Sequence, residues 1–227
     1  MNRIEVCFKS IKEDNKKALI PFLTAGDPSP CLTVSLMHEL VLAGSDIIEL
    51  GVPFSDPMAD GPVIQRASER ALHQGTNTDN VFDIVAEFRT KDKTTPIILM
   101  GYLNPIEIMG YKNFVKKASK VGVDGLIVVD LPPEESEHLQ NAISQYEMDQ
   151  IFLLSPTTVC SRIDRICKIA SGFLYYVSLK GVTGSNELDV KTVENKIEEI
   201  RTKTTLPLAV GFGIKDAKLA QAIGNIS

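Results

Sequence analysis

The sequence predicts an α/β protein of the (β/α)8 TIM barrel class, with the eighth β/α unit missing from the 227 residues. Short apolar runs recur along the chain, each carries Gly or Pro near its end, and a helical pattern follows. Strands that are apolar on both faces and alternate with helices indicate a parallel sheet covered by helices. Seven such runs favour a barrel over an open doubly wound sheet. A complete barrel usually needs roughly 250 residues, so the count is one unit short.

The predicted strands are all rich in Ile, Leu, Val or Phe. In chain order they are ALIPFLTAG (18–26), DIIELGVPF (46–54), PIILMGY (96–102), GLIVVDLPP (125–133), QIFLLSPTT (150–158), FLYYVSLKGVTG (173–184) and PLAVGFGI (207–214). The segments between them, such as 31–44 and 134–147, have apolar residues at i, i+3, i+4 spacing, which predicts helices. No linker or low-complexity segment divides the chain, so we expect one domain over residues 1–227.

Composition and charge exclude several classes of protein. A net charge of −5 and the absence of Trp argue against a nucleic-acid surface. No apolar stretch approaches the length of a membrane span, and the amino-terminal residues lack the apolar core of a signal peptide. The four cysteines show no CxxC spacing, which predicts free and mostly buried thiols in a reducing cytoplasm.

Glu49 is the first candidate catalytic residue, because it interrupts the apolar strand 46–54. No Lys or Arg occurs in the strand runs before Lys180, so we expect Glu49 to have no cationic partner. A carboxyl group in such a place should have a raised pKa, which suits general acid–base chemistry near neutral pH. The other interpretation is a structural glutamate paired with a base.

Asp60 lies in the proline-rich loop that follows the same strand. From this loop it could reach the end of the barrel where we expect Glu49 to lie. An Asp-Gly-Pro sequence is usually only a turn, so the functional interpretation of Asp60 depends on its pairing with Glu49. Asp56 fits a loop cap or a contact with a partner. Two glycine-rich turns, 181–184 and 211–214, follow the last two strands and could bind a phosphate through backbone N–H groups.

Several absences narrow the chemistry. The three histidines fall in separate predicted helices, so we expect no metal site. No strand carries a Schiff-base lysine, and no dinucleotide-binding fingerprint or Gly-x-Ser-x-Gly motif occurs. After these exclusions, the sequence is left with one kind of site, in which two carboxylates act on a phosphorylated substrate.

The motif ELGVPFSDPMADGP closely resembles the signature of the tryptophan synthase α subunit family. Further blocks resemble that family in the same order along nearly the whole chain, namely PFLTAGDP, GYLNP, VVDLPPEE, LLSPTT, VSLKGVTG and LAVGFGI. The resemblance implies a (β/α)8 barrel and a lyase of tryptophan biosynthesis, which cleaves indole-3-glycerol phosphate to indole and glyceraldehyde 3-phosphate by retro-aldol chemistry. The family completes its phosphate site in the eighth β/α unit, and we expect that this segment was lost from the sequence.

The resemblance also implies roles for individual residues. Glu49 would be the main acid–base group, Asp60 its partner on the indole N–H, and Tyr175 a third group at the catalytic site. Thr183 would orient Asp60. The implied substrate-binding residues are Phe22, Met100, Tyr102, Ile127, Val129, Thr183, Gly184, Phe212 and Gly213, of which the glycines would hold the phosphate.

The resemblance further implies a partner. The family's α subunit docks on a β subunit that carries pyridoxal phosphate, in an α2β2 heterotetramer, and no cofactor belongs to the α chain itself. The implied interface residues are Pro53, Asp56, Pro57, Asn104 and Pro105.

Two other functions stay open from the sequence. One is a catalytically impaired binding module that allosterically activates the β subunit. The other is a different phosphate-binding barrel enzyme, such as a sugar-phosphate isomerase or an indole-glycerol phosphate synthase. These enzymes would be expected to carry a histidine or lysine on a strand, and the predicted strands have neither.

Overall fold

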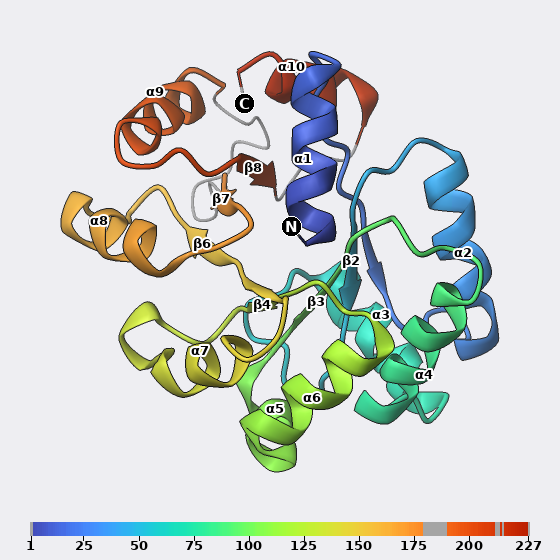
Figure 1. Ribbon diagram of the computed structural model, residues 1–227. Coiled ribbons are helices and arrows are strands. Elements are labelled where there is room, and N and C mark those ends of the chain that lie inside the picture. Colours follow the sequence, from blue (N-terminus) through green and yellow to red (C-terminus); the bar gives the residue numbers. More distant parts are fainter. Residues whose placement is uncertain (1, 179–189, 212–213, 215, 227) are drawn as a thin grey trace. The chain divides into compact units, whose positions relative to one another are not determined.

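The computed structural model describes residues 2–178, 190–211, 214 and 216–226 (Figure 1). They form two compact units, Met1–Gln150 and Ile151–Ser227. Each unit contains a parallel sheet whose strands alternate with helices along the chain, as an α/β fold requires. The single domain over residues 1–227 stays a prediction.

The first unit has a five-stranded sheet in the order β1-β2-β3-β4-β5. Its strands are β1 (Phe22–Thr24), β2 (Ile48–Gly51), β3 (Ile97–Gly101), β4 (Gly125–Val128) and β5 (Asp149–Gln150). Its helices are α1 (Arg3–Glu13), α2 (Pro30–Leu42), α3 (Pro62–His73), α4 (Thr78–Arg89), α5 (Leu103–Met109), α6 (Tyr111–Val121), the 3-10 helix η1 (Pro133–Glu135) and α7 (Glu137–Ile143).

The second unit has a three-stranded parallel sheet in the order β6-β7-β8. Its strands are β6 (Phe152–Leu154), β7 (Leu174–Val177) and β8 (Leu208–Gly211). The described helices of this unit are α8 (Cys160–Ile169), α9 (Val190–Arg201) and α10 (Ala217–Gly224).

Every predicted strand contains an observed one, but two elements differ from the prediction. The strand expected at 150–158 is interrupted at Ile151, so that β5 pairs with β4 and β6 pairs with β7. The helix expected at 134–147 is shorter: the segment begins as η1, and α7 ends at Ile143. Helix α1 at residues 3–13 was not among the predicted helices, although Asn2 and Glu5 form a capping box that starts it.

The two faces of the first sheet have different neighbours. Helices α2, α4, α6 and α7 pack side by side along one face (Figure 1). Their apolar side chains, such as Val85 and Phe88, form one core with alternate strand residues, such as Leu50 and Leu99. Because side chains alternate along a strand, Glu49 lies on the opposite face from this helix-covered core.

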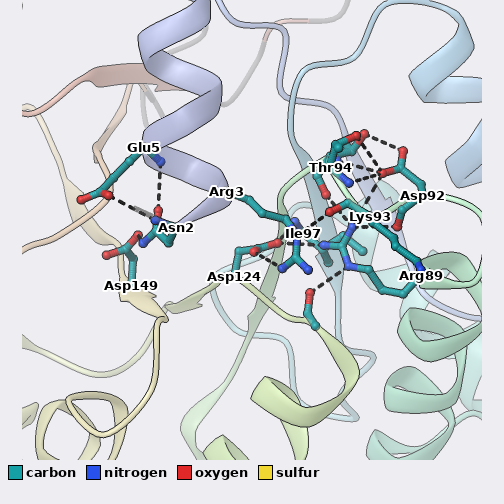
Figure 2. Close-up of polar contacts among 12 residues, drawn as sticks. Asn2, Arg3, Glu5, Arg89, Asp92, Lys93, Thr94, Ile97, Asp124 and Asp149 are labelled. Atoms are coloured by element: carbon teal, nitrogen blue, oxygen red, sulfur yellow. Dashed lines mark hydrogen bonds and ion pairs between the residues drawn. The ribbon is translucent and has the colours of Figure 1, made fainter.

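A polar network fixes α1 at the amino ends of the strands (Figure 2). The carboxylate of Asp124, just before β4, accepts hydrogen bonds from Arg3 at 2.8 Å and from Arg89 at 2.8 Å. It also accepts one from the Ile97 backbone N–H at 2.7 Å, at the start of β3. Asn2 donates to Asp149 of β5 at 2.6 Å. These bonds connect α1, α4 and three strands at a single end of the sheet.

The cysteines and histidines are placed as follows. All four cysteines are free, but Cys31 and Cys160 are exposed and Cys7 and Cys167 are only partly buried, so the prediction of burial is wrong for the first two and met only in part by the others. Each histidine lies in a different helix, and the described residues contain no cluster of side chains that could hold a metal ion. Within the same residues, no helix has the length and apolar character needed to cross a membrane.

We expect Asp124→Asn to lower the free energy of unfolding by about 3 kcal/mol, because it leaves Arg89 buried without its carboxylate. Urea denaturation measures this change. The control is Asp79→Asn, which removes an exposed ion pair with Lys117 and should cost less than about 1 kcal/mol. Equal losses of unfolding free energy in the two variants would show that the buried network stabilises the protein no more than an exposed ion pair does.

Candidate active site

Glu49 lies in the middle of β2, between Phe22 of β1 and Ile98 of β3 in the parallel register. Only 2% of its surface is exposed. Its Oε1 atom is buried and accepts no hydrogen bond from any described residue. Burial raises the pKa of the Glu49 carboxyl from its usual value of 4.5 to about 8. A carboxyl group with this pKa holds a proton at neutral pH and can also release it there.

Asp60 lies in the loop between β2 and α3, and its carboxylate is oriented by Tyr102. The Tyr102 hydroxyl donates to Asp60 Oδ2 at 2.9 Å. Partial burial raises the pKa of Asp60, while the hydrogen bond from Tyr102 opposes that rise. The Asp60 backbone is held as well, since Gln65 of α3 donates to its carbonyl at 2.8 Å.

A pocket opens at the carboxyl end of the first sheet, on the side of Glu49. Five of the residues predicted from the sequence line it: Phe22, Asp60, Met100, Tyr102 and Val129. Glu49 is two residues before Gly51, which forms part of the same wall. Ile127 is the register partner of Met100, but it does not line this pocket.

Six lining residues were not predicted as site residues from the sequence: Thr24, Gly51, Val52, Ile64, Ser68 and Gly101. Ile64 and Ser68 are four residues apart on α3, which begins just after Asp60, so they share one helix face. That spacing, next to a candidate catalytic loop, is the signal that could have identified them. Ser68 is buried and places a hydroxyl beside a mostly apolar pocket.

An aromatic ring leans over a glycine in each unit. A Cβ atom added at Gly51 would lie 2.4 Å from Cζ of Phe22, so the ring occupies the space that a side chain would need. In the second unit, a Cβ atom at Gly211 would lie 1.9 Å from the hydroxyl of Tyr175. Both aromatic residues precede the register partner of their glycine by two positions along the neighbouring strand.

Some predicted site residues are not brought together by the described structure. Tyr175 is buried in β7 of the second unit, so its approach to Glu49 stays a prediction. The remaining predicted substrate-binding residues lie outside the described residues, namely Thr183, Gly184, Phe212 and Gly213.

The predicted interface residues lie in the loop that follows β2 (Pro53, Asp56 and Pro57) and in the first turn of α5 (Asn104 and Pro105). Asp56 and Asn104 are exposed, Pro57 and Pro105 are partly exposed, and Pro53 is buried. Two large apolar side chains in the same segments are also exposed, Met58 by 84% and Ile108 by 81%.

Parallel strands, helices between them and a buried carboxyl of raised pKa in a strand fit one class, an enzyme of the (β/α)8 TIM barrel type, which the similar solved structures share. The family model "Tryptophan synthase alpha chain" matches residues 8–227. A tryptophan synthase alpha chain from Nitrosococcus oceani is 56% identical over 227 residues, which are 100% of this chain and 84% of that protein. The chain therefore belongs to the tryptophan synthase alpha chain family.

Solved structures agree with this assignment. The crystal structure of tryptophan synthase subunit alpha from Legionella pneumophila matches with a TM-score of 0.94 and 47% identity, over 100% of this chain and 84% of that one. A structure of the tryptophan synthase a2b2 complex from Pyrococcus furiosus matches with a TM-score of 0.85 and 38% identity, over 92% of this chain and 83% of that one. These matches confirm the fold class predicted from the sequence.

We expect Gly51→Ala to lower the free energy of unfolding by about 2 kcal/mol, because the new methyl group forces the Phe22 ring to move. Urea denaturation measures the change in the free energy of unfolding for Gly51→Ala, for Phe22→Leu and for the double variant. The double variant should be less destabilised than the sum of the single changes. Strict additivity would contradict the close approach of the two residues.

Burial of Glu49 also predicts how stability changes with pH. The folded-state pKa of about 8 exceeds the usual 4.5, so the folded protein binds the extra proton between these values. Stability should therefore fall as pH rises from about 5 to 8. Relative to wild type, Glu49→Gln should gain up to about 4 kcal/mol at pH 8 and little at pH 5. Urea midpoints at both pH values measure this, with the exposed Glu87→Gln as control.

Proposed function

We propose that this chain is the α subunit of a tryptophan synthase and cleaves indole-3-glycerol phosphate to indole and glyceraldehyde 3-phosphate. The observation that carries the proposal is Glu49, a buried carboxyl with a pKa of about 8 beside a pocket that also contains Asp60. Membership of the tryptophan synthase alpha chain family supports the substrate and the reaction.

The first step is protonation of the indole ring at C3. Protonated Glu49 donates the proton, and the electron pair comes from the enamine of the ring. The ring nitrogen becomes electron-poor, and the Asp60 carboxylate accepts a hydrogen bond from its N–H and stabilises the positive charge. The indole ring is its own electron sink, so the step needs neither a lysine nor a metal ion.

The second step breaks the bond between C3 and the side chain. Glu49 is now a carboxylate and takes the proton of the adjacent side-chain hydroxyl. The oxygen forms the aldehyde carbonyl, the carbon–carbon bond breaks, and its electrons restore the aromatic ring. Glu49 is protonated again at the end of the cycle, and a pKa near neutrality makes both proton transfers accessible.

The other site residues have supporting roles in this proposal. The rings and apolar side chains at the pocket wall hold the indole, and Tyr175 approaches the reacting atoms. Thr183 orients Asp60, and backbone N–H groups near the glycines hold the phosphate. The set assigned to binding is Phe22, Met100, Tyr102, Ile127, Val129, Thr183, Gly184, Phe212 and Gly213.

The partner in this proposal is a tryptophan synthase β subunit, with which the chain forms an α2β2 complex in the cytoplasm. The similar structure from Pyrococcus furiosus is that of a tryptophan synthase a2b2 complex, which supports this partner. The exposed Met58 and Ile108, beside Asp56 and Asn104, supply the apolar area that a docking surface needs. Pyridoxal phosphate belongs to the β subunit, and the α chain uses no cofactor. We further propose that residues 1–227 act as one domain.

The alternative functions have less support. No observation favours a binding module without turnover over an enzyme, because Glu49 and Asp60 are both placed at the pocket end of the sheet. Among the described residues, β1 to β8 carry no lysine or histidine that would serve another phosphate-binding barrel enzyme.

Indole release from indole-3-glycerol phosphate, measured with a β subunit present, tests the proposal. We expect Glu49→Gln to lower kcat at least about 100-fold, because the amide cannot transfer the proton. The control is Glu87→Gln on the exposed side of α4, which should keep wild-type kcat. Full activity in Glu49→Gln would show that the glutamate is structural and would overturn the proposed mechanism.

A further inference from the structure

Tyr102 makes two hydrogen bonds to the loop that carries Asp60. Its hydroxyl donates to Asp60 Oδ2 at 2.9 Å and accepts from the Ala59 backbone N–H at 3.0 Å. Both partners lie more than 40 residues earlier in the sequence, in the loop between β2 and α3. One oxygen atom thus connects the end of β3 to the candidate catalytic loop.

The Tyr102 side chain is held firmly from its own side. It follows β3 directly and precedes α5, whose first N–H, at Leu103, donates to Asp130 Oδ1 at 2.8 Å. Only 5% of Tyr102 is exposed, and its ring stacks on Phe54 with the centroids 5.2 Å apart. A hydroxyl on such a fixed ring can impose a position on a loop.

The other hydrogen bonds of the loop, among the described residues, do not reach the carboxylate of Asp60. Met58 N–H donates to the carbonyl of Asp56, and Asp60 N–H donates to the carbonyl of Pro57. Gln65 donates to the Asp60 carbonyl. Within the described part of the chain, the Tyr102 hydroxyl is the one group that donates to the Asp60 carboxylate.

If Tyr102 only lined the pocket, its ring would be enough and its hydroxyl would not be needed, because phenylalanine fills almost the same volume. We propose that Tyr102 is a positioning residue for Asp60, and that its hydroxyl holds both the carboxylate and the Ala59 amide in the arrangement that receives the substrate. This inference rests on the role proposed above for Asp60. It assigns the Tyr102 hydroxyl a task separate from the apolar contact of the ring.

The electrostatics of the loop agree with this task. Partial burial raises the pKa of Asp60, and the hydrogen bond from Tyr102 lowers it. Burial and the charges of Asp60 and Asp130 raise the pKa of the Tyr102 hydroxyl, so it stays protonated and keeps donating. Removing the hydroxyl should therefore raise the pKa of Asp60.

Nuclear magnetic resonance of the ligand-free protein gives a test that does not depend on activity. In wild type, the Ala59 amide should be protected from hydrogen exchange although the residue is exposed. In Tyr102→Phe, this amide should exchange faster and the carboxyl of Asp60 should titrate at higher pH. The control is Tyr111→Phe, which removes a surface hydroxyl bonded to Glu107 and should change neither signal.

Kinetics test the functional consequence. Tyr102→Phe should lower kcat about tenfold, the factor expected for one hydrogen bond to a charged group, with little change in KM. The acid limb of the pH profile should move to higher pH, because Asp60 must be charged. In an Asp60→Asn background, adding Tyr102→Phe should cost little more, since the hydroxyl acts through the carboxylate.

The outcomes separate this inference from the proposed function. If Ala59 exchange and Asp60 titration are the same in wild type and Tyr102→Phe, the inference is wrong, whatever the activity. An unprotected Ala59 amide in wild type would overturn it without any variant. If the NMR signals change as expected but wild type does not cleave indole-3-glycerol phosphate, the positioning contact stands and the proposed function fails.

Discussion

The carboxylate of Asp124 is the contact on which the first unit depends. Its oxygens are shared by two arginine side chains and one backbone N–H, and these belong to α1, α4 and the start of β3. An ion pair in a buried place stabilises only when its remaining hydrogen-bonding capacity is satisfied. Here that condition is met at the amino ends of the strands, where Asp124 accepts from all three donors.

The pocket end of the sheet shows the opposite balance. Glu49 is as buried as Asp124, at 2% exposure each, yet one of its oxygens has no hydrogen-bond partner among the described residues. The same lack of a partner that costs stability gives the carboxyl a pKa of about 8. Asp124 and Glu49 are thus equally buried but have different roles, because the charge of Asp124 is neutralised by arginine whereas Glu49 is neutralised by a proton.

Glu49 could be found from the sequence because a charge in an apolar strand is conspicuous, and Asp60 because it follows in a stiffened loop. Ser68 was harder to find, because a helix face that lines a pocket has the same spacing as one that packs on a sheet, and only its place just after the Asp60 loop distinguishes it. The second function of Tyr102 depends on where its hydroxyl points, which no sequence pattern records. The break at Ile151 was also invisible, since QIFLL continues as one apolar run.

Phe22 over Gly51 in the first unit, and Tyr175 over Gly211 in the second, have a consequence for how each unit can change during evolution. A larger residue at either glycine is excluded while the neighbouring ring keeps its size, and a smaller ring leaves a void above the glycine. Each position is therefore constrained by the other, and substitutions at the two should be inherited together. Variation in the shape of either sheet near its glycine would then proceed through paired replacements on adjacent strands, not through independent single steps.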